Sequence, residues 1–207
     1  MTRFFPLITL LLACTLGYGC TSGLTQDAEV LEKRYFVLQV ERPGAPHASP
    51  SPGVCKVKDV TISPSFSSRE MVYRLSHSSF STDYYNQYHS SPDDLISQTM
   101  RHWIDEARLF EYVTDPSSEV RPQYYLEGHV VSLYGDFSTP GNPAAVLKMQ
   151  FFLLKDEDFD FAIRMDKDYE RSIPLAEKSA EGVVDGLNAA LADILAELEA
   201  DLAAHLP

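Results

Sequence analysis

The side chains most able to do chemistry in this sequence match no common catalytic or metal-binding motif. No HExxH, zinc-type Cys/His pair, G-x-S-x-G, phosphate loop or G-x-G-x-x-G is present. The six histidines are scattered, at His47, His77, His89, His102, His129 and His205. We therefore expect no catalytic residue, no bound metal and no cofactor. One alternative stays open, a hydrolase in which the fold brings His77 or His89 to a serine and an acid.

A cluster of acids is the one candidate for cation binding, and its sequence does not support that role. The cluster consists of Asp156, Glu157, Asp158 and Asp160. The spacing of an EF-hand calcium loop is absent. We expect a solvated turn between two strands instead.

The cysteine at position 20 is the residue with the most specific chemistry. Met1-Thr2-Arg3 gives a positive start, Phe4 to Leu16 is uncharged and mostly apolar, and Gly17-Tyr18-Gly19 precedes Cys20. This layout is typical of a secretory signal, and the apolar run is too short for a transmembrane helix of about 20 residues. The ending resembles a bacterial lipobox, which implies that Cys20 becomes the first mature residue and carries covalent lipid.

Two other interpretations of the N-terminus stay open. The lipobox has leucine three residues before the cysteine, where this chain has Gly17, and Leu16 lies one place too early. Leu11-Leu12-Ala13-Cys14 has better-placed residues but would leave a very short apolar region. An ordinary signal peptide followed by a chance cysteine is the third interpretation.

Lipid at Cys20 would explain both anchoring and location. Each buried methylene contributes about 0.8 kcal/mol, and stable anchoring needs more than one acyl chain, which a multiply acylated cysteine supplies. Thr21 follows Cys20, and bacterial lipoproteins without aspartate at this place are generally sorted to the outer membrane. We expect a signal peptide over 1–19, a polar tether over 20–33 and one domain over 34–207.

Composition and charge describe an ordinary folded domain. The chain has 207 residues, of which 44% are hydrophobic, and a net charge of −13. This excess of carboxylates repels polyphosphate, so nucleic acid is not an expected partner. Cys55 would be the one cysteine in the body of the domain, and we expect it to act as a small buried hydrophobe.

Periodicity predicts an α/β domain of α+β character, a mixed sheet packed on two main helices. Expected strands are 34–40 inside the sheet, 54–62, 71–75, 80–88 and 124–134. A hairpin follows, with Ala145 to Leu153 alternating in one strand and Phe159, Phe161, Ile163 and Met165 in the next. Ser91-Pro92-Asp93-Asp94 predicts a helix start, and its apolar stripe contains Ile96, Met100, Trp103, Ile104 and Ala107.

A long amphipathic helix is expected from about Leu175 to His205. Its apolar stripe consists of Val184, Leu187, Leu191, Ile194, Leu198 and Leu202. This stripe is expected to cover the sheet, with an extension into a subunit interface as an open alternative. The segment Tyr84-Tyr85-Asn86-Gln87-Tyr88 has two interpretations of equal standing, a binding surface or an edge strand that packs aromatics on the following helix.

The order of several segments resembles one protein family. Asp59-Val60-Thr61-Ile62-Ser63-Pro64 leads to Arg69-Glu70-Met71-Val72-Tyr73-Arg74, then to the tyrosine-rich stretch and Ser91-Pro92. Together with Tyr35-Phe36-Val37-Leu38, this order resembles the ABC-type transport auxiliary lipoproteins, the PqiC-like group, from Arg34 to the last helix. Arg69, Tyr73, Tyr84, Tyr85 and Tyr88 match the family's most recognisable segments and are the candidate partner-binding residues, with a purely structural role as the other interpretation.

The resemblance implies a non-enzymatic lipoprotein on the periplasmic face of the outer membrane. Its implied partners are an MCE-domain protein that spans the periplasm and the associated ABC-type lipid transport machinery. Self-association into a homo-oligomer is a further implication. An outer-membrane assembly lipoprotein that binds a β-barrel or lipopolysaccharide is the alternative with a similar anchor and fold.

Overall fold

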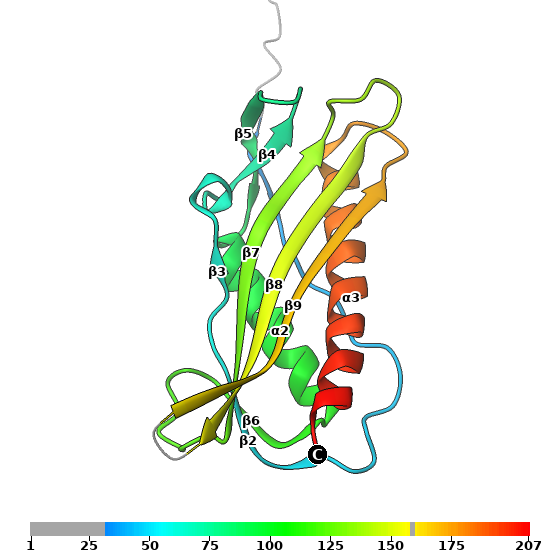
Figure 1. The fold of residues 1–207 in the computed structure, drawn as a ribbon. Helices are drawn as coiled ribbons and strands as arrows, with labels where there is room; N and C mark the ends of the chain where they lie inside the picture. Colours follow the sequence, from blue (N-terminus) through cyan, green and yellow to red (C-terminus); the bar gives the residue numbers. More distant parts are fainter. Residues whose placement is uncertain (1–31, 158–159) are drawn as a thin grey trace, which may run out of the picture. The chain divides into compact units, whose positions relative to one another are not determined.

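A computed structural model describes the fold of residues 32–157 and 160–207. Figure 1 shows long strands beside the C-terminal helix. The strands are β1 (Arg34–Phe36), β2 (Ser51–Val57), β3 (Thr61–Ile62), β4 (Glu70–Arg74), β5 (Phe80–Tyr88), β6 (Phe110–Thr114), β7 (Tyr124–Asp136), β8 (Ala144–Glu157) and β9 (Asp160–Pro174). The helices are the 3-10 turn η1 (Pro64–Phe66), α2 (Pro92–Ala107) and α3 (Ala180–His205).

Strand β7 organises the whole sheet. One of its edges pairs along its full length with antiparallel β8, which pairs in turn with β9. Its other edge takes three short parallel strands in succession: β2 at its start, β3 in its middle and β4 at its end. Strand β6 extends the sheet beside β2, and β5 and β1 extend it beside β4. The expected mixed sheet and single domain are confirmed, with Lys33–Pro207 as one compact unit.

The core lies between one face of this sheet and the two helices. In β8 the five residues expected to face inward, Ala145, Leu147, Met149, Phe151 and Leu153, are all buried. Every member of the stripes expected on the two helices is buried as well. Both periodicities therefore identified the core side of their elements correctly.

Both helix starts follow local capping rules. Helix α2 has Pro92 in its first turn together with Asp93 and Asp94, although Ser91 makes no side-chain cap hydrogen bond. Helix α3 begins at Ala180, five residues later than expected, because Ser179 caps it by accepting from the Gly182 backbone N–H. Leu175 lies in the preceding loop and packs against the core instead.

The first strand corrects one expectation. Only Arg34–Phe36 forms a strand, and it pairs with β5 alone, at the end of the strand order. The following residues leave the sheet and run along the helices, where Leu38 is buried. The Thr99 hydroxyl donates to the Leu38 carbonyl and the Gln39 N–H donates to Asn188. The segment therefore buries Leu38 between the two helices, whereas Tyr35 and Val37 on its other side are 52% and 46% exposed, so its two apolar sides do not indicate an inner strand.

Two further elements differ from the expected strands. The expected strand 54–62 is two strands, β2 and β3, which dock separately on β7. Strand β6 was not expected from the sequence. It has only five residues, of which Glu111 and Tyr112 are exposed, so its pattern carries little periodic signal.

A β-bulge in β9 corrects the expected alternation there. Leu153 pairs with Met165 but Leu154 pairs with Ile163, so Arg164 is an extra residue. Met165 therefore faces the core, whereas Ile163 and Phe161 face solvent and are 63% and 54% exposed. A single bulged residue reverses the side that the earlier residues face. Phe159 and Asp158, from the expected strand and acidic turn, lie outside the described residues.

Candidate functional site

The tyrosine-rich segment forms a three-residue bulge in β5, opposite β4. Glu70 pairs with Gln87, but the next residue, Met71, pairs with Asp83. Tyr84, Tyr85 and Asn86 are therefore extra residues with no partners on β4. The bulge directs the two tyrosines outward, where they are 59% and 41% exposed and pack edge to face with centroids 5.3 Å apart.

Asp83 holds this bulge in shape. Its carboxylate accepts hydrogen bonds from the Tyr85 and Asn86 backbone N–H groups, the Asn86 amide and the Tyr73 hydroxyl. Partial burial alone would raise the pKa of Asp83, but these hydrogen bonds together lower it below its ordinary value. Burial, followed by the nearby Asp83 charge, raises the pKa of Tyr73. The ionised Asp83 carboxylate, with hydrogen bonds to both of its oxygens, therefore fixes the conformation of the segment.

The structure distributes the five candidate partner-binding residues unevenly. Tyr84 and Tyr85 are on the surface, whereas Tyr88 is 2% exposed and belongs to the core. Tyr73 stacks on Phe137 with centroids 5.0 Å apart. Arg69 donates from its Nε to the Tyr88 carbonyl at 3.0 Å. Partner binding by the five residues stays a prediction, and of the three tyrosines in the segment only Tyr84 and Tyr85 are substantially exposed.

Cationic groups surround the exposed tyrosines. The Lys33 ammonium lies 3.7 Å from the Tyr84 ring centroid, and the Arg69 guanidinium lies 5.5 Å from the Tyr35 ring centroid. Both are cation–π distances. Arg34 donates to Asn86 of the bulge at 2.8 Å and pairs with Glu181 of α3. The point where the described chain begins is thus bound directly to the tyrosine bulge.

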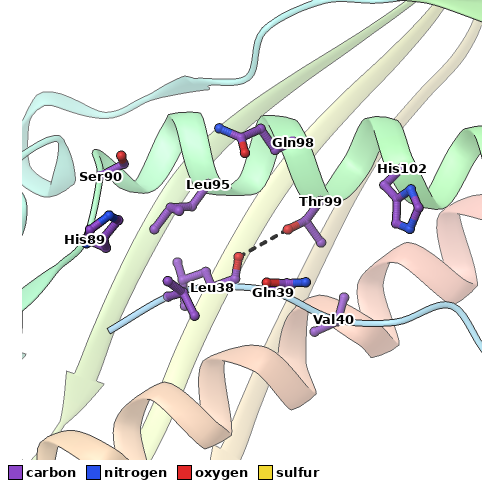
Figure 2. Close-up of a pocket in the computed structure, with 10 residues that line it drawn as sticks. Leu38, Gln39, Val40, His89, Ser90, Leu95, Gln98, Thr99 and His102 are labelled. Carbon is purple, nitrogen blue, oxygen red and sulfur yellow. Dashed lines mark hydrogen bonds between the residues drawn. The ribbon is translucent and has the colours of Figure 1, made fainter. Parts of the chain in front are cut away.

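A groove of about 470 Å³ lies beside this region, between the segment after β1 and α2. Figure 2 shows Leu38, Gln39 and Val40 on one side and Leu95, Gln98 and Thr99 on the other. His89 and His102 lie toward its ends. No aspartate or glutamate is among its lining residues, and His102 has its acid outside the groove lining, with Glu106 of the same helix 3.3 Å away.

Among the described histidines that have side-chain partners, no two share a partner. His129 accepts or donates at 2.7 Å to the Thr61 hydroxyl and at 3.4 Å to the Ser63 hydroxyl. In residues 32–157 and 160–207, no carboxylate joins that group by a hydrogen bond. Within the same ranges, His77 and His89 make no side-chain hydrogen bond, and no three metal-binding side chains cluster. The arrangement that the hydrolase alternative requires is therefore not formed by the described residues.

Cys55 is fully buried and unpaired among the described residues. Burial raises the pKa of its thiol, which suppresses the reactive thiolate. The expected role as a small core hydrophobe agrees with this position.

Sequence comparison assigns this chain to a protein family. Residues 36–199 match the family model described as "ABC-type transport auxiliary lipoprotein component". The chain belongs to this family. The match runs from Phe36 at the end of β1 to Glu199 in α3, so it includes the tyrosine bulge, α2 and most of α3 of this auxiliary lipoprotein. No sequence among the curated proteins matches it significantly.

Solved structures share the fold of this auxiliary lipoprotein. Protein XCC0632 from Xanthomonas campestris is similar with a TM-score of 0.71 at 15% identity, over 83% of this chain and 96% of that chain. The hypothetical protein CT253 from Chlamydia trachomatis is similar with a TM-score of 0.53 at 9% identity, over 74% of this chain and 99% of that chain. At these identities the likeness concerns the fold alone.

The expected lipid anchor lies in the N-terminal 31 residues, which the structure does not describe. Cys20, its rival Cys14, the signal peptide and most of the tether fall outside the described residues, so acylation stays a prediction. Among the helices that are described, none has the length and apolarity needed to cross a bilayer.

Sequence reasoning missed two features of the surface. One is the exposed pair Phe161 and Ile163, which the β9 bulge turns outward. The other is Glu199 of α3, whose carboxylate accepts from Arg42, His47 and Trp103. The sequence around Glu199 did not indicate this cluster of hydrogen bonds, because Arg42, His47 and Trp103 are about 95 or more residues away along the chain.

Proposed function

We propose that this auxiliary lipoprotein is a non-enzymatic component of an intermembrane lipid transport system, held on the periplasmic face of the outer membrane by lipid on Cys20. Its partner would be an MCE-domain protein of the associated ABC-type machinery. The family match over residues 36–199 carries the proposal. The signal-like N-terminus, Cys20 and Thr21 support the anchor and the location.

The serine–histidine contact among the described residues lacks the orienting acid of a catalytic triad. A catalytic triad needs a nucleophile, a base and an orienting group in mutual contact. Ser63 and His129 are 3.4 Å apart, but the other imidazole nitrogen is bound to the hydroxyl of Thr61. A threonine hydroxyl cannot stabilise an imidazolium as a carboxylate does.

Acylation is tested by metabolic labelling with a radioactive fatty acid. Cys20→Ala should abolish labelling and leave unprocessed or released protein, whereas Cys14→Ala should remain labelled. Labelling that persists in Cys20→Ala and is lost in Cys14→Ala would move the anchor to Cys14. Separation of inner and outer membranes on a density gradient then tests the location of the labelled protein.

Partnership is tested by affinity capture from detergent-solubilised envelopes of cells that express both proteins. We expect an MCE-domain protein to be recovered with the native chain. Recovery of a β-barrel protein in its place would favour the assembly-lipoprotein alternative. Recovery of neither, with both proteins present at normal levels, would contradict the proposed partnership.

A further inference from the structure

The large apolar side chains exposed on the described surface fall into two groups. Tyr35, Val37, Leu75, Phe80, Tyr84 and Tyr85 lie on β1, the β4–β5 hairpin and the residues joined to them. Tyr112, Val120, Phe161 and Ile163 lie on β6, the loop after it and the start of β9. Figure 1 shows β4 and β5 at one end of the long strands and β6 with the end of β8 and the start of β9 at the other. The two groups therefore occupy opposite ends of the body.

The chain enters the body at the first of these ends. Lys33 stacks on Tyr84, and Arg34 pairs with the bulge through Asn86. We define the entry face as Lys33, Tyr35, Arg69, Tyr84 and Tyr85. It combines three half-exposed tyrosines with two cations.

The geometry points to a lipid bilayer as the surface that the entry face binds, with the tyrosine rings placed among the lipid headgroups. This inference rests on the anchor in the proposed function. Thirteen peptide steps separate Cys20 from Lys33, a path that spans at most about 45 Å when fully extended. Acylated Cys20 would therefore hold the entry face within that distance of the membrane.

The chemistry of the entry face suits that interface. Tyrosine has an apolar ring and a polar tip, and it is enriched where hydrocarbon meets water. Lys33 and Arg69 can approach lipid phosphates while their stems lie along the rings. Asp83, which directly precedes Tyr84, is occupied by donors of its own segment. The net charge of −13 repels an anionic surface elsewhere, which favours contact through this end alone.

The test uses the acylated full-length chain on vesicles of phosphatidylethanolamine and phosphatidylglycerol that contain brominated phosphatidylcholine, which quenches nearby indoles. Trp103 is 2% exposed and provides a constant baseline. Tyr84→Trp places an indole on the entry face, and Tyr112→Trp places one at the opposite end on an equally exposed tyrosine. Tyr85→Trp is a second entry-face position if Tyr84→Trp does not fold.

We expect quenching of the entry-face indole to exceed that at position 112 several-fold, in protein that floats with the vesicles. Flotation with equal or no quenching at the two positions would overturn the entry-face inference and leave the anchor intact. Failure to float would overturn the anchor and the inference together. A photo-cross-linker at position 84 that captures a protein rather than lipid in intact cells would assign the face to a protein partner and also overturn the inference.

Discussion

At the scale of single residues, carboxylates held by several donors fix the local structure. Asp136 at the end of β7 accepts from the Arg74 guanidinium and from the backbone and hydroxyl of Ser138. The Arg74 hydrogen bond is the main cause that lowers the pKa of Asp136 to about 2, and Ser138 adds to it. This group fastens the end of β4 to the end of β7, beside the β4–β5 hairpin.

The depressed pKa of Asp136 predicts a pH-dependent contribution to stability. A carboxylate with a lower pKa in the folded state stabilises the fold above its unfolded-state pKa of about 3.9, and that contribution is lost as pH falls toward the folded-state value. Asp136→Asn should therefore lower the free energy of unfolding by about 2 kcal/mol at pH 7, and by less at each step below pH ~4. Urea unfolding between pH 7 and 3 measures this. Asp193→Asn, on the exposed face of α3, is the control and should show no such trend.

At the scale of elements, the β9 bulge decides which side chains belong to the core. Met165 is 3% exposed and Ile163 is exposed, although both lie on the same side of an unbulged strand. Met165→Ala should cost about 2–5 kcal/mol because it empties a packed site. Ile163→Ser should change stability by no more than about 0.5 kcal/mol. Urea unfolding of both variants checks this, and a larger loss for Ile163→Ser would contradict the bulged register.

The approach of α3 to the sheet depends on a helix glycine. A Cβ at Gly186 would lie 2.7 Å from the Ala145 Cβ and 2.7 Å from a Leu175 methyl carbon. Gly186→Ala should therefore destabilise the fold by about 1–3 kcal/mol through overpacking, although alanine is the better helix former.

A matched control separates packing from helix propensity at this site. Ala196 is exposed on the same helix, so Ala196→Gly should cost about 1 kcal/mol from propensity alone. Thermal unfolding of the two variants compares the effects. A Gly186→Ala variant more stable than the native chain would show that α3 does not pack this closely.

At the scale of the whole molecule, the connection from β1 to β2 crosses from one end of the sheet to the other along the helices. Arg42 donates to both Glu199 oxygens, at 2.8 and 2.7 Å, while His47 lies 2.9 Å from the same carboxylate. Trp103 of α2 donates to it from its indole at 2.9 Å. The Arg42 hydrogen bond is the main cause that lowers the pKa of Glu199. One carboxylate thus joins the connection to both helices.

Removal of Arg42 should have a larger effect than removal of a surface arginine. The Arg42 and Glu199 side chains are 7% and 13% exposed, so Arg42→Ala would leave a largely buried carboxylate without its cation, at a cost of about 3 kcal/mol. Arg164→Ala breaks the exposed pair with Glu157 and should cost less than about 1 kcal/mol. Chemical unfolding at pH 7 compares the two variants. Equal losses of unfolding free energy would show that the Arg42–Glu199 pair stabilises the fold no more than a surface ion pair does.

The sequence by itself determined the elements whose signals are local. The alternation in β8, the apolar stripes of α2 and α3, the Ser91-Pro92 start and the bounds of β5 all depend on neighbours within a few residues. The family resemblance identified from segment order was also confirmed by the match over residues 36–199.

Only the tertiary structure decided the features that depend on distant partners. The docking of β2, β3 and β4 along β7, the strand β6 and the short β1 are set by pairing between residues far apart in sequence. The bulges that expose Tyr84, Tyr85, Phe161 and Ile163 are set by register. A bulge changes which residue faces which partner without changing residue type, so periodicity cannot reveal it. For the same reason, the sequence indicated a tyrosine-rich segment, while the fold separated its exposed rings from the buried Tyr88.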